Sequence, residues 1–282
     1  MSHQQTAVDC YWRDFPIAPG KWSQLFPANP QMGVVIGTFA AVPYVHLQLE
    51  AWKRLYPCVP LLVHDDCSHR SDAIFRLCES YGADFECNSR RFPRWLGDLS
   101  VFWGGLNWAS SRRIHILLKL SRRWLFLEDW TSNLRSLAIA SQYHTFSNYT
   151  KSFGFGFRTE CVGLAVQPWK ASAFDRDFCA MVEEDKGRFV EGYMHRIARK
   201  LDECVPAVKA WRVVNPAPPD RDGYAAWDLM GTDRRTKSDI RLWHDANGPE
   251  DYLAIAQRWQ LGYKLKDFID PNEGKGARRL EK

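Results

Sequence analysis

Three short clusters of residues stand at the ends of apolar runs in this chain: one forms a small, flexible turn and two are rich in charge. The clusters occupy residues 37–40 (GTFA), 65–68 (DDCS) and 121–123 (SRR), and Lys119 lies just before the last of them. Adjacent carboxylates such as Asp65 and Asp66 repel each other, so fold stability gives little reason to place two of them together. An acidic pair and a group of cations at such positions favour a ligand site. The structural alternative is that Asp66 or Ser68 caps the helix that follows.

Strands and helices alternate through the first half of the chain, and this alternation decides where the polar clusters lie. Continuous apolar runs are typical of strands covered on both faces, and apolar residues at helical spacing predict the helices between them. The predicted strands are 32–39, 61–63, 84–87 and 114–120, and the predicted helices are 44–55, 72–81 and 97–109. The order predicts an α/β fold, with a mostly parallel central sheet and helices on both faces. Ligands bind such sheets at the carboxyl ends of the strands, where the clusters fall.

The second half of the chain has less regular patterning. Strand-like pieces occur within 142–157 and at 161–166, and helices are predicted at 171–184, 188–203 and 249–261. We expect an irregular N-terminal arm (1–31), a ligand-binding half (32–130), a second half of the same domain (131–270) and a flexible tail (271–282).

Composition excludes several classes of protein. The chain has 282 residues, 45% hydrophobic and 25% charged, which are ordinary values for a globular protein. Its formal net charge is 38 − 33 = +5, too slight to indicate a nucleic-acid-binding protein by itself. The eight cysteines form no C-x-x-C pair, and no stretch approaches the ~20 apolar residues that span a bilayer. Without a signal-peptide pattern, we expect a soluble, cytoplasmic protein.

The polar clusters and their spacing resemble the start of a GT-A glycosyltransferase, most closely the family 2 type. The resemblance covers roughly residues 32–130 and is carried by VVIGTF (34–39), LLVHDDCS (61–68) and YGA (81–83). It implies a GT-A-like fold and nucleotide binding by a set of residues at the strand ends. These are Thr38, Phe39, Asp65, Asp66 and, in a segment similar to the family's helix beside the diphosphate, Arg94.

One departure from the family concerns the metal motif. GT-A enzymes usually carry Asp-x-Asp after the fourth strand, where this chain has Ser121 and two arginines. Arginine or lysine can neutralise a leaving diphosphate without a metal, so Lys119, Arg122 and Arg123 are predicted to bind it. A solvated basic turn is the alternative. Mn²⁺ or Mg²⁺ is expected only if Glu128 and Asp129 act as a displaced metal motif.

Sugar transfer with inversion needs a carboxylate that takes the proton of the acceptor hydroxyl. Similarity to the family's helix start makes Glu191 a candidate base, and Glu160, before a probable strand, competes with it. Either side chain could instead be a solvated charge. His244, followed by Asp245, is a further candidate contact for metal or phosphate.

The resemblance implies an enzyme of the hexosyltransferase class, EC 2.4. It would move a sugar from a nucleotide-diphosphate sugar, with UDP favoured, to a glycan or lipid-linked acceptor, without metal. No nucleic acid and at most peripheral membrane contact are expected. The alternatives are a non-catalytic nucleotide-sugar-binding protein and a nucleic-acid-binding module using the many arginines. The tryptophans at 95, 103, 108, 124 and 130 are mostly expected in the core, with one or two lining an acceptor.

Overall fold

A computed structural model describes residues 26–129, 131, 144–148, 158–204, 241–242 and 247–269. The strands within these ranges are β1 (Met32–Thr38), β2 (Leu61–Asp65), β3 (Asp84–Cys87), β4 (Ile116–Ser121), β5 (Leu125–Phe126), β6 (Thr145–Asn148), β7 (Arg158–Ala165) and β8 (Arg241–Leu242). The helices are α2 (Val42–Leu55), α3 (Ser71–Tyr81), α4 (Arg94–Ser111), α6 (Val166–Lys170), α7 (Phe174–Glu183), α8 (Val190–Cys204), α10 (Pro249–Arg258) and α11 (Leu265–Phe268).

Six of the described strands form one sheet in the order β3-β2-β1-β4-β7-β6. The first four are parallel to one another, and β7 runs antiparallel to both β4 and β6. Because β7 runs against β4, β7 begins at the edge of the sheet where β1, β2 and β4 end. We call this edge the carboxyl edge.

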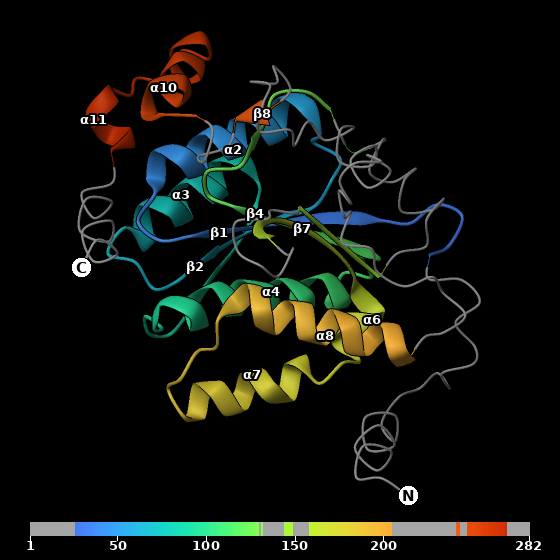
Figure 1. Cartoon of the computed structure of the whole chain (residues 1–282). Coiled ribbons are helices and arrows are strands. Elements are labelled where there is room, and N and C mark those ends of the chain that lie inside the picture. The colour runs from blue at the N-terminus through green and yellow to red at the C-terminus, as the bar shows by residue number, and fades with distance from the viewer. Residues whose placement is uncertain are drawn as a thin grey trace, which may run out of the picture.

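Helices cover both faces of this sheet, as Figure 1 shows. On one face, alternate residues such as Val34 and Ile36 pack with the apolar sides of α2 and α3. On the other face, Val35 and Leu117 pack against α4, with α6, α7 and α8 in the same apolar cluster. The strands are buried on both faces, which explains why their sequences are continuously apolar instead of alternating.

A smaller layer packs on the outer side of α2. It contains the two-stranded sheet of β5 and β8 together with α10 and α11, and Tyr44 of α2 is central to it. The Tyr44 hydroxyl donates to the Phe268 carbonyl at 2.7 Å, and its ring meets the rings of Tyr252 and Phe268 edge to face. None of the helices in the described ranges has the length and apolar character that a membrane crossing requires.

The predicted fold class is confirmed: the structure is α/β, with a mostly parallel sheet between two helical layers. The element bounds differ from expectation mainly at helix ends. The helix predicted to begin at residue 97 begins at Arg94, the helix predicted over 171–184 is α7, and the short helix α6 before it was not predicted. The arm up to residue 25 and the tail from residue 270 lie outside the described residues. The division into halves stays a prediction.

Candidate functional site

The last residues of three neighbouring strands meet at the carboxyl edge. Thr38 of β1 lies opposite Asp65 of β2, and Gly37 lies opposite Ser121 of β4. Thr38 Oγ1, Asp65 Oδ1 and Ser121 Oγ are buried side-chain oxygens without a hydrogen-bond partner among the described residues. Buried polar atoms of this kind are uncommon in native structures, and an absent ligand or water is one explanation. Three of them on adjacent strands mark this edge as a candidate binding site.

Asp65 also stabilises the turn that follows β2, through its second carboxylate oxygen. Its Oδ2 accepts hydrogen bonds from the Ser68 backbone N–H (2.8 Å) and from the Ser71 hydroxyl (2.6 Å). These bonds fix the turn between β2 and α3. Neither Asp66 nor Ser68 is the N-cap of this helix, which is Arg70, although the Ser68 hydroxyl oxygen accepts from the Arg70 backbone N–H at 3.3 Å.

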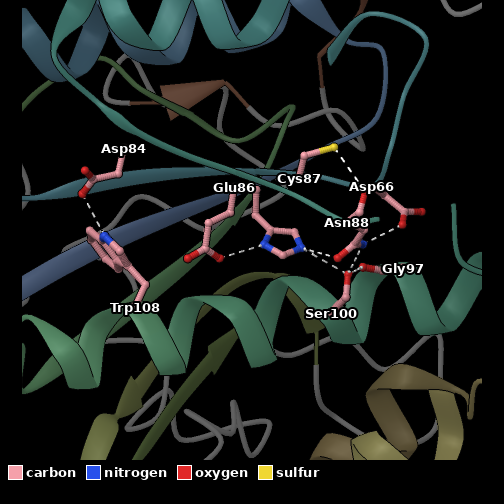
Figure 2. Close-up of polar contacts among 9 residues, drawn as sticks. Asp66, Asp84, Glu86, Cys87, Asn88, Gly97, Ser100 and Trp108 are labelled. Atoms are coloured by element: carbon pink, nitrogen blue, oxygen red, sulfur yellow. Dashed lines mark hydrogen bonds and ion pairs between the residues drawn. The ribbon is translucent and has the colours of Figure 1, made fainter. Parts of the chain in front are cut away.

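Asp66 faces the opposite side of the strand end and ties two loops together. Its Oδ1 accepts from the Asn88 side-chain amide at 2.8 Å and from the Phe92 backbone N–H at 3.2 Å, and Figure 2 shows it beside Asn88. Burial raises the pKa of Asp66, and the hydrogen bonds from Asn88 and Phe92 offset part of this effect. The nearby Arg91 charge also favours the carboxylate. Asp66 thus fixes the 88–93 loop against the end of β2.

Asn88 is held from two further directions, by His64 and by Ser100 of α4. The Asn88 amide group donates to both Asp66 and the Ser100 hydroxyl, each at 2.8 Å. Its oxygen, 3.1 Å from His64 Nε2, must then accept a hydrogen bond from the N–H of that nitrogen. His64 Nδ1 faces Glu86 Oε2 at 3.6 Å, an ion-pair distance too long for a hydrogen bond. Figure 2 shows Asn88, Ser100 and Asp66 together beside the first turns of α4.

Two arginines converge on Phe39, the first residue after β1. The Arg91 guanidinium lies over the Phe39 ring, 4.0 Å from its centroid. Arg122 Nη1, from the turn after β4, donates to the Phe39 carbonyl at 3.1 Å. Cations from two separate loops therefore lie next to the ends of β1 and β2, so the acidic and basic clusters meet at the same edge.

Arg123 points toward the smaller layer of the fold. Its guanidinium lies 5.5 Å from the centroid of the Tyr44 ring, and its carbonyl accepts from the Tyr252 hydroxyl at 2.5 Å. The residue therefore links the end of β4 to α2 and α10. Its predicted contact with a diphosphate stays a prediction.

Lys119 lies elsewhere than the predicted phosphate site. It is in the middle of β4, with a side chain only 2% exposed, facing α4. Its Nζ lies 2.6 Å from Asp98 Oδ1 and 2.7 Å from the Thr159 carbonyl, and it is 4.9 Å from the centroid of the Phe102 ring. The ammonium group is thus engaged inside the protein, and we do not include it in the proposed phosphate site.

The residues after β4 do not suit a divalent cation. Hard cations take oxygen ligands, chiefly carboxylates, whereas Ser121 is followed here by two arginines. Glu128 and Asp129 are exposed beyond β5, and Asp129 Oδ1 accepts from the Thr131 backbone N–H and hydroxyl. In the described ranges no three His, Cys, Asp or Glu side chains form a group that could hold a metal. Metal independence stays a prediction.

The two candidate bases lie on elements that begin at the carboxyl edge. Glu160 is near the start of β7, next to Cys161, which pairs with Leu120 of β4. Glu191 is in the first turn of α8, and both side chains are partly exposed. Arg94 is the first residue of α4, and its side chain lies outside the described part, as does all of His244.

Two residues of this edge, Asn88 and Arg91, were not identified from the sequence as members of the site. Asn88 directly follows β3, in the position that Asp66 has after β2, and this equivalence was the available signal. Arg91 lies in the basic segment RRFPR (90–94), where nothing in the sequence distinguishes it from a solvated cation. Its place over Phe39 depends on the bonds that Asp66 makes to the same loop, and no local pattern reports them.

Comparison with known proteins gives similarity of fold at low identity. TarS 1–349 of S. aureus in complex with UDP-GlcNAc has a TM-score of 0.39 and 10% identity, over 52% of this chain and 47% of that one. A mannosyltransferase from Pyrobaculum calidifontis, in complex with GDP-Man and Mn²⁺, has a TM-score of 0.40 and 13% identity, over 99% of this chain and 87% of that one. A cytidylyltransferase from Leptospira borgpetersenii has a TM-score of 0.39 and 11% identity, over 82% of this chain and 95% of that one.

The chain thus spans about half the length of the TarS structure that it matches. No protein-family model matches the chain, and no curated protein matches its sequence. Because one fold carries many activities, these similarities assign none, and function must be argued from the residues of this chain.

Proposed function

We propose that this protein is a glycosyltransferase that binds a nucleotide-diphosphate sugar at the carboxyl edge of its sheet. The observation that carries the proposal is that hydrogen-bonding oxygens and cationic side chains lie together at this edge. Thr38 Oγ1 and Asp65 Oδ1, neighbours across β1 and β2, offer a hydroxyl and a carboxylate oxygen without protein partners among the described residues. Arg91 and Arg122 bring positive charge to the adjacent Phe39. A nucleotide diphosphate combines a hydrogen-bonding base with a charged diphosphate, and so matches both parts.

In this proposal the arginines act on the leaving group. The acceptor hydroxyl oxygen bonds to the anomeric carbon as the bond between that carbon and the diphosphate oxygen breaks. The electron pair of the broken bond leaves with the diphosphate, and Arg91, Arg122 and Arg123 stabilise its growing negative charge. No step is assigned to a metal ion, because the side chains after β4 do not suit one.

The hydroxyl proton passes to a carboxylate in the same step. Glu160 and Glu191 are the two candidates, and they are distinguished by substitution with glutamine, which keeps the shape and removes the basic oxygen. The true base is the one whose loss abolishes transfer to the acceptor while the protein still binds the nucleotide.

Nucleotide release from a set of donors tests the proposal. UDP-glucose, UDP-GlcNAc, GDP-mannose, dTDP-glucose and a CMP-sugar are each incubated with the protein, in EDTA and in Mn²⁺. We expect release from at least one donor, UDP-sugars first, at equal rates in EDTA and Mn²⁺. Arg122→Ala should slow it roughly tenfold or more. The control is Arg76→Ala, which removes an exposed arginine of α3 that is not part of the proposed site.

Three outcomes would change the assignment. Tight nucleotide binding without any release would favour a non-catalytic nucleotide-sugar-binding protein. Release only in Mn²⁺ would remove the metal-independent mechanism. If no donor binds, and Arg122→Ala and Arg76→Ala behave alike, the proposed site is wrong.

A further inference from the structure

Two aromatic rings are exposed at the start of α4 and α8. Trp95 is the second residue of α4 and 44% exposed, and Phe189 directly precedes α8 and is 36% exposed. Their ring centroids are 6.1 Å apart and their planes meet at 80°. An edge-to-face arrangement leaves ring faces that the partner ring does not cover. We refer to Trp95 and Phe189 as the aromatic pair.

The two segments that carry the aromatic pair are fixed to each other. Gly187 packs so closely on α4 that a Cβ atom there would lie 2.6 Å from the Leu96 backbone nitrogen. Arg90 Nη1, from the loop before α4, lies 2.8 Å from Asp185 Oδ1, in the turn before α8. The exposed rings are therefore held in place by close packing and an ion pair, and a ligand would not have to order them.

The surroundings of the aromatic pair suit a saccharide. One side of a pyranose ring is a row of C–H groups that stacks on an aromatic face, while its rim of hydroxyls needs hydrogen-bonding partners. The side chains of Arg90 and Asp185 are 50% and 56% exposed in the same two segments. The aromatic pair is a small exposed surface in segments that also carry these two exposed charged groups, whereas protein-docking surfaces are larger and continuously apolar.

We propose that the aromatic pair is an acceptor subsite that stacks a pyranose ring of a glycan. The assignment rests on the proposed glycosyl transfer and names the acceptor class for the same site. Glu191, one of the two candidate bases, is two residues after Phe189 in the first turn of α8. The aromatic pair and this candidate base therefore belong to the same end of α8.

Saccharide binding is measured without any donor, by saturation-transfer NMR with maltose, cellobiose, lactose and N,N′-diacetylchitobiose. At least one disaccharide should bind the full chain. Phe189→Ala and Trp95→Ala should each weaken binding roughly threefold to tenfold, while Trp95→Phe keeps a stacking face and most of the affinity. The matched control is Phe75→Ala, which removes an equally exposed ring that pairs with Phe85 on β3.

The proposal is overturned if none of the four disaccharides binds, or if Phe75→Ala weakens binding as much as the substitutions in the pair. It is also overturned if Phe189→Ala converts an oligomer to a monomer, because the pair would then be an interface between copies. Thermal denaturation shows whether each variant folds, and Trp95→Phe supplies the test if an alanine variant does not. Failure of donor turnover with pair-dependent saccharide binding intact would refute the proposed function and leave the binding site standing.

Discussion

Acidification is predicted to destabilise the protein through His144, which is fully buried just before β6. The Trp169 indole N–H donates to the Thr145 hydroxyl oxygen at 2.9 Å, so the Thr145 proton is directed to His144 Nδ1 at 2.8 Å. An imidazole nitrogen that accepts a hydrogen bond in this way must be unprotonated. Protonation would break this bond and place a charge in the interior, and burial accordingly lowers the pKa of His144 to about 3.

The size of the effect follows from the difference between the folded and unfolded pKa values. The unfolded chain takes up a proton below its pKa of 6.5, whereas the folded chain resists protonation down to about 3. The contribution of His144 is therefore complete above pH 6.5 and decreases as the pH falls below it. Between pH 7 and pH 5 the loss is about 2 kcal/mol, at 1.36 kcal/mol per unit of difference. Burial also lowers the pKa values of His46 and His115, which add to the loss in the same direction.

Urea unfolding followed by tryptophan fluorescence at pH 7, 6 and 5 measures this dependence. His144→Gln removes the titrating group, so its free energy of unfolding should fall by about 2 kcal/mol less than that of the unsubstituted protein over this range. His69→Gln, which removes a solvent-exposed imidazole of the loop after β2, serves as the control. If the unsubstituted protein and His144→Gln show parallel pH dependence, the buried neutral imidazole is not the cause and the reasoning fails.

Three further predictions concern stability, each measured as a free energy of unfolding in urea. Gly97→Ala places a Cβ atom against the Asp66 carboxylate and should cost about 1–3 kcal/mol, so an unchanged unfolding midpoint would contradict the packing described. Lys119→Met leaves the Thr159 carbonyl without its donor and should cost about 1–3 kcal/mol, and a stability gain would show that burial of the ammonium outweighs its bonds. Gly82→Ala should cost about 1–2 kcal/mol, because Gly82 ends α3 at φ 74°, and no loss would indicate that the helix end rearranges.

The alternation of strand and helix was predictable from the sequence because burial on both faces makes each strand of a parallel sheet an apolar run. The polar strand ends were predictable for the same reason, since Thr38, Asp65 and Ser121 stand where those runs stop. The direction of β7 was not predictable. Its apolar residues pack in the same way whether it runs with β4 or against it, and the pairing of Leu120 with Cys161 is a long-range contact that no local pattern reports.

Lys119 shows why the sequence alone misplaces a side chain near a strand end. The alternation of Leu118, Lys119 and Leu120 already places the lysine on the other face of β4 from its two neighbours. What the sequence does not report is Asp98, one turn into α4, which approaches that face and pairs with the ammonium. A lysine two residues before the end of a strand can therefore reach a ligand only if the helix that packs on the same face of the sheet provides no acidic partner for it.

Arg91 is the converse case, a cation that no local pattern distinguishes from a solvated one but that long-range contacts place at the site. Asp66 accepts from the Phe92 backbone N–H and so draws the end of the 88–93 loop onto β2. The guanidinium of Arg91 then lies over Phe39, while its charge favours the ionised form of Asp66. In the proposed site, the two carboxylates therefore have different roles. Asp65 offers an oxygen to the ligand, and Asp66 holds the loop that brings Arg91 to the ligand.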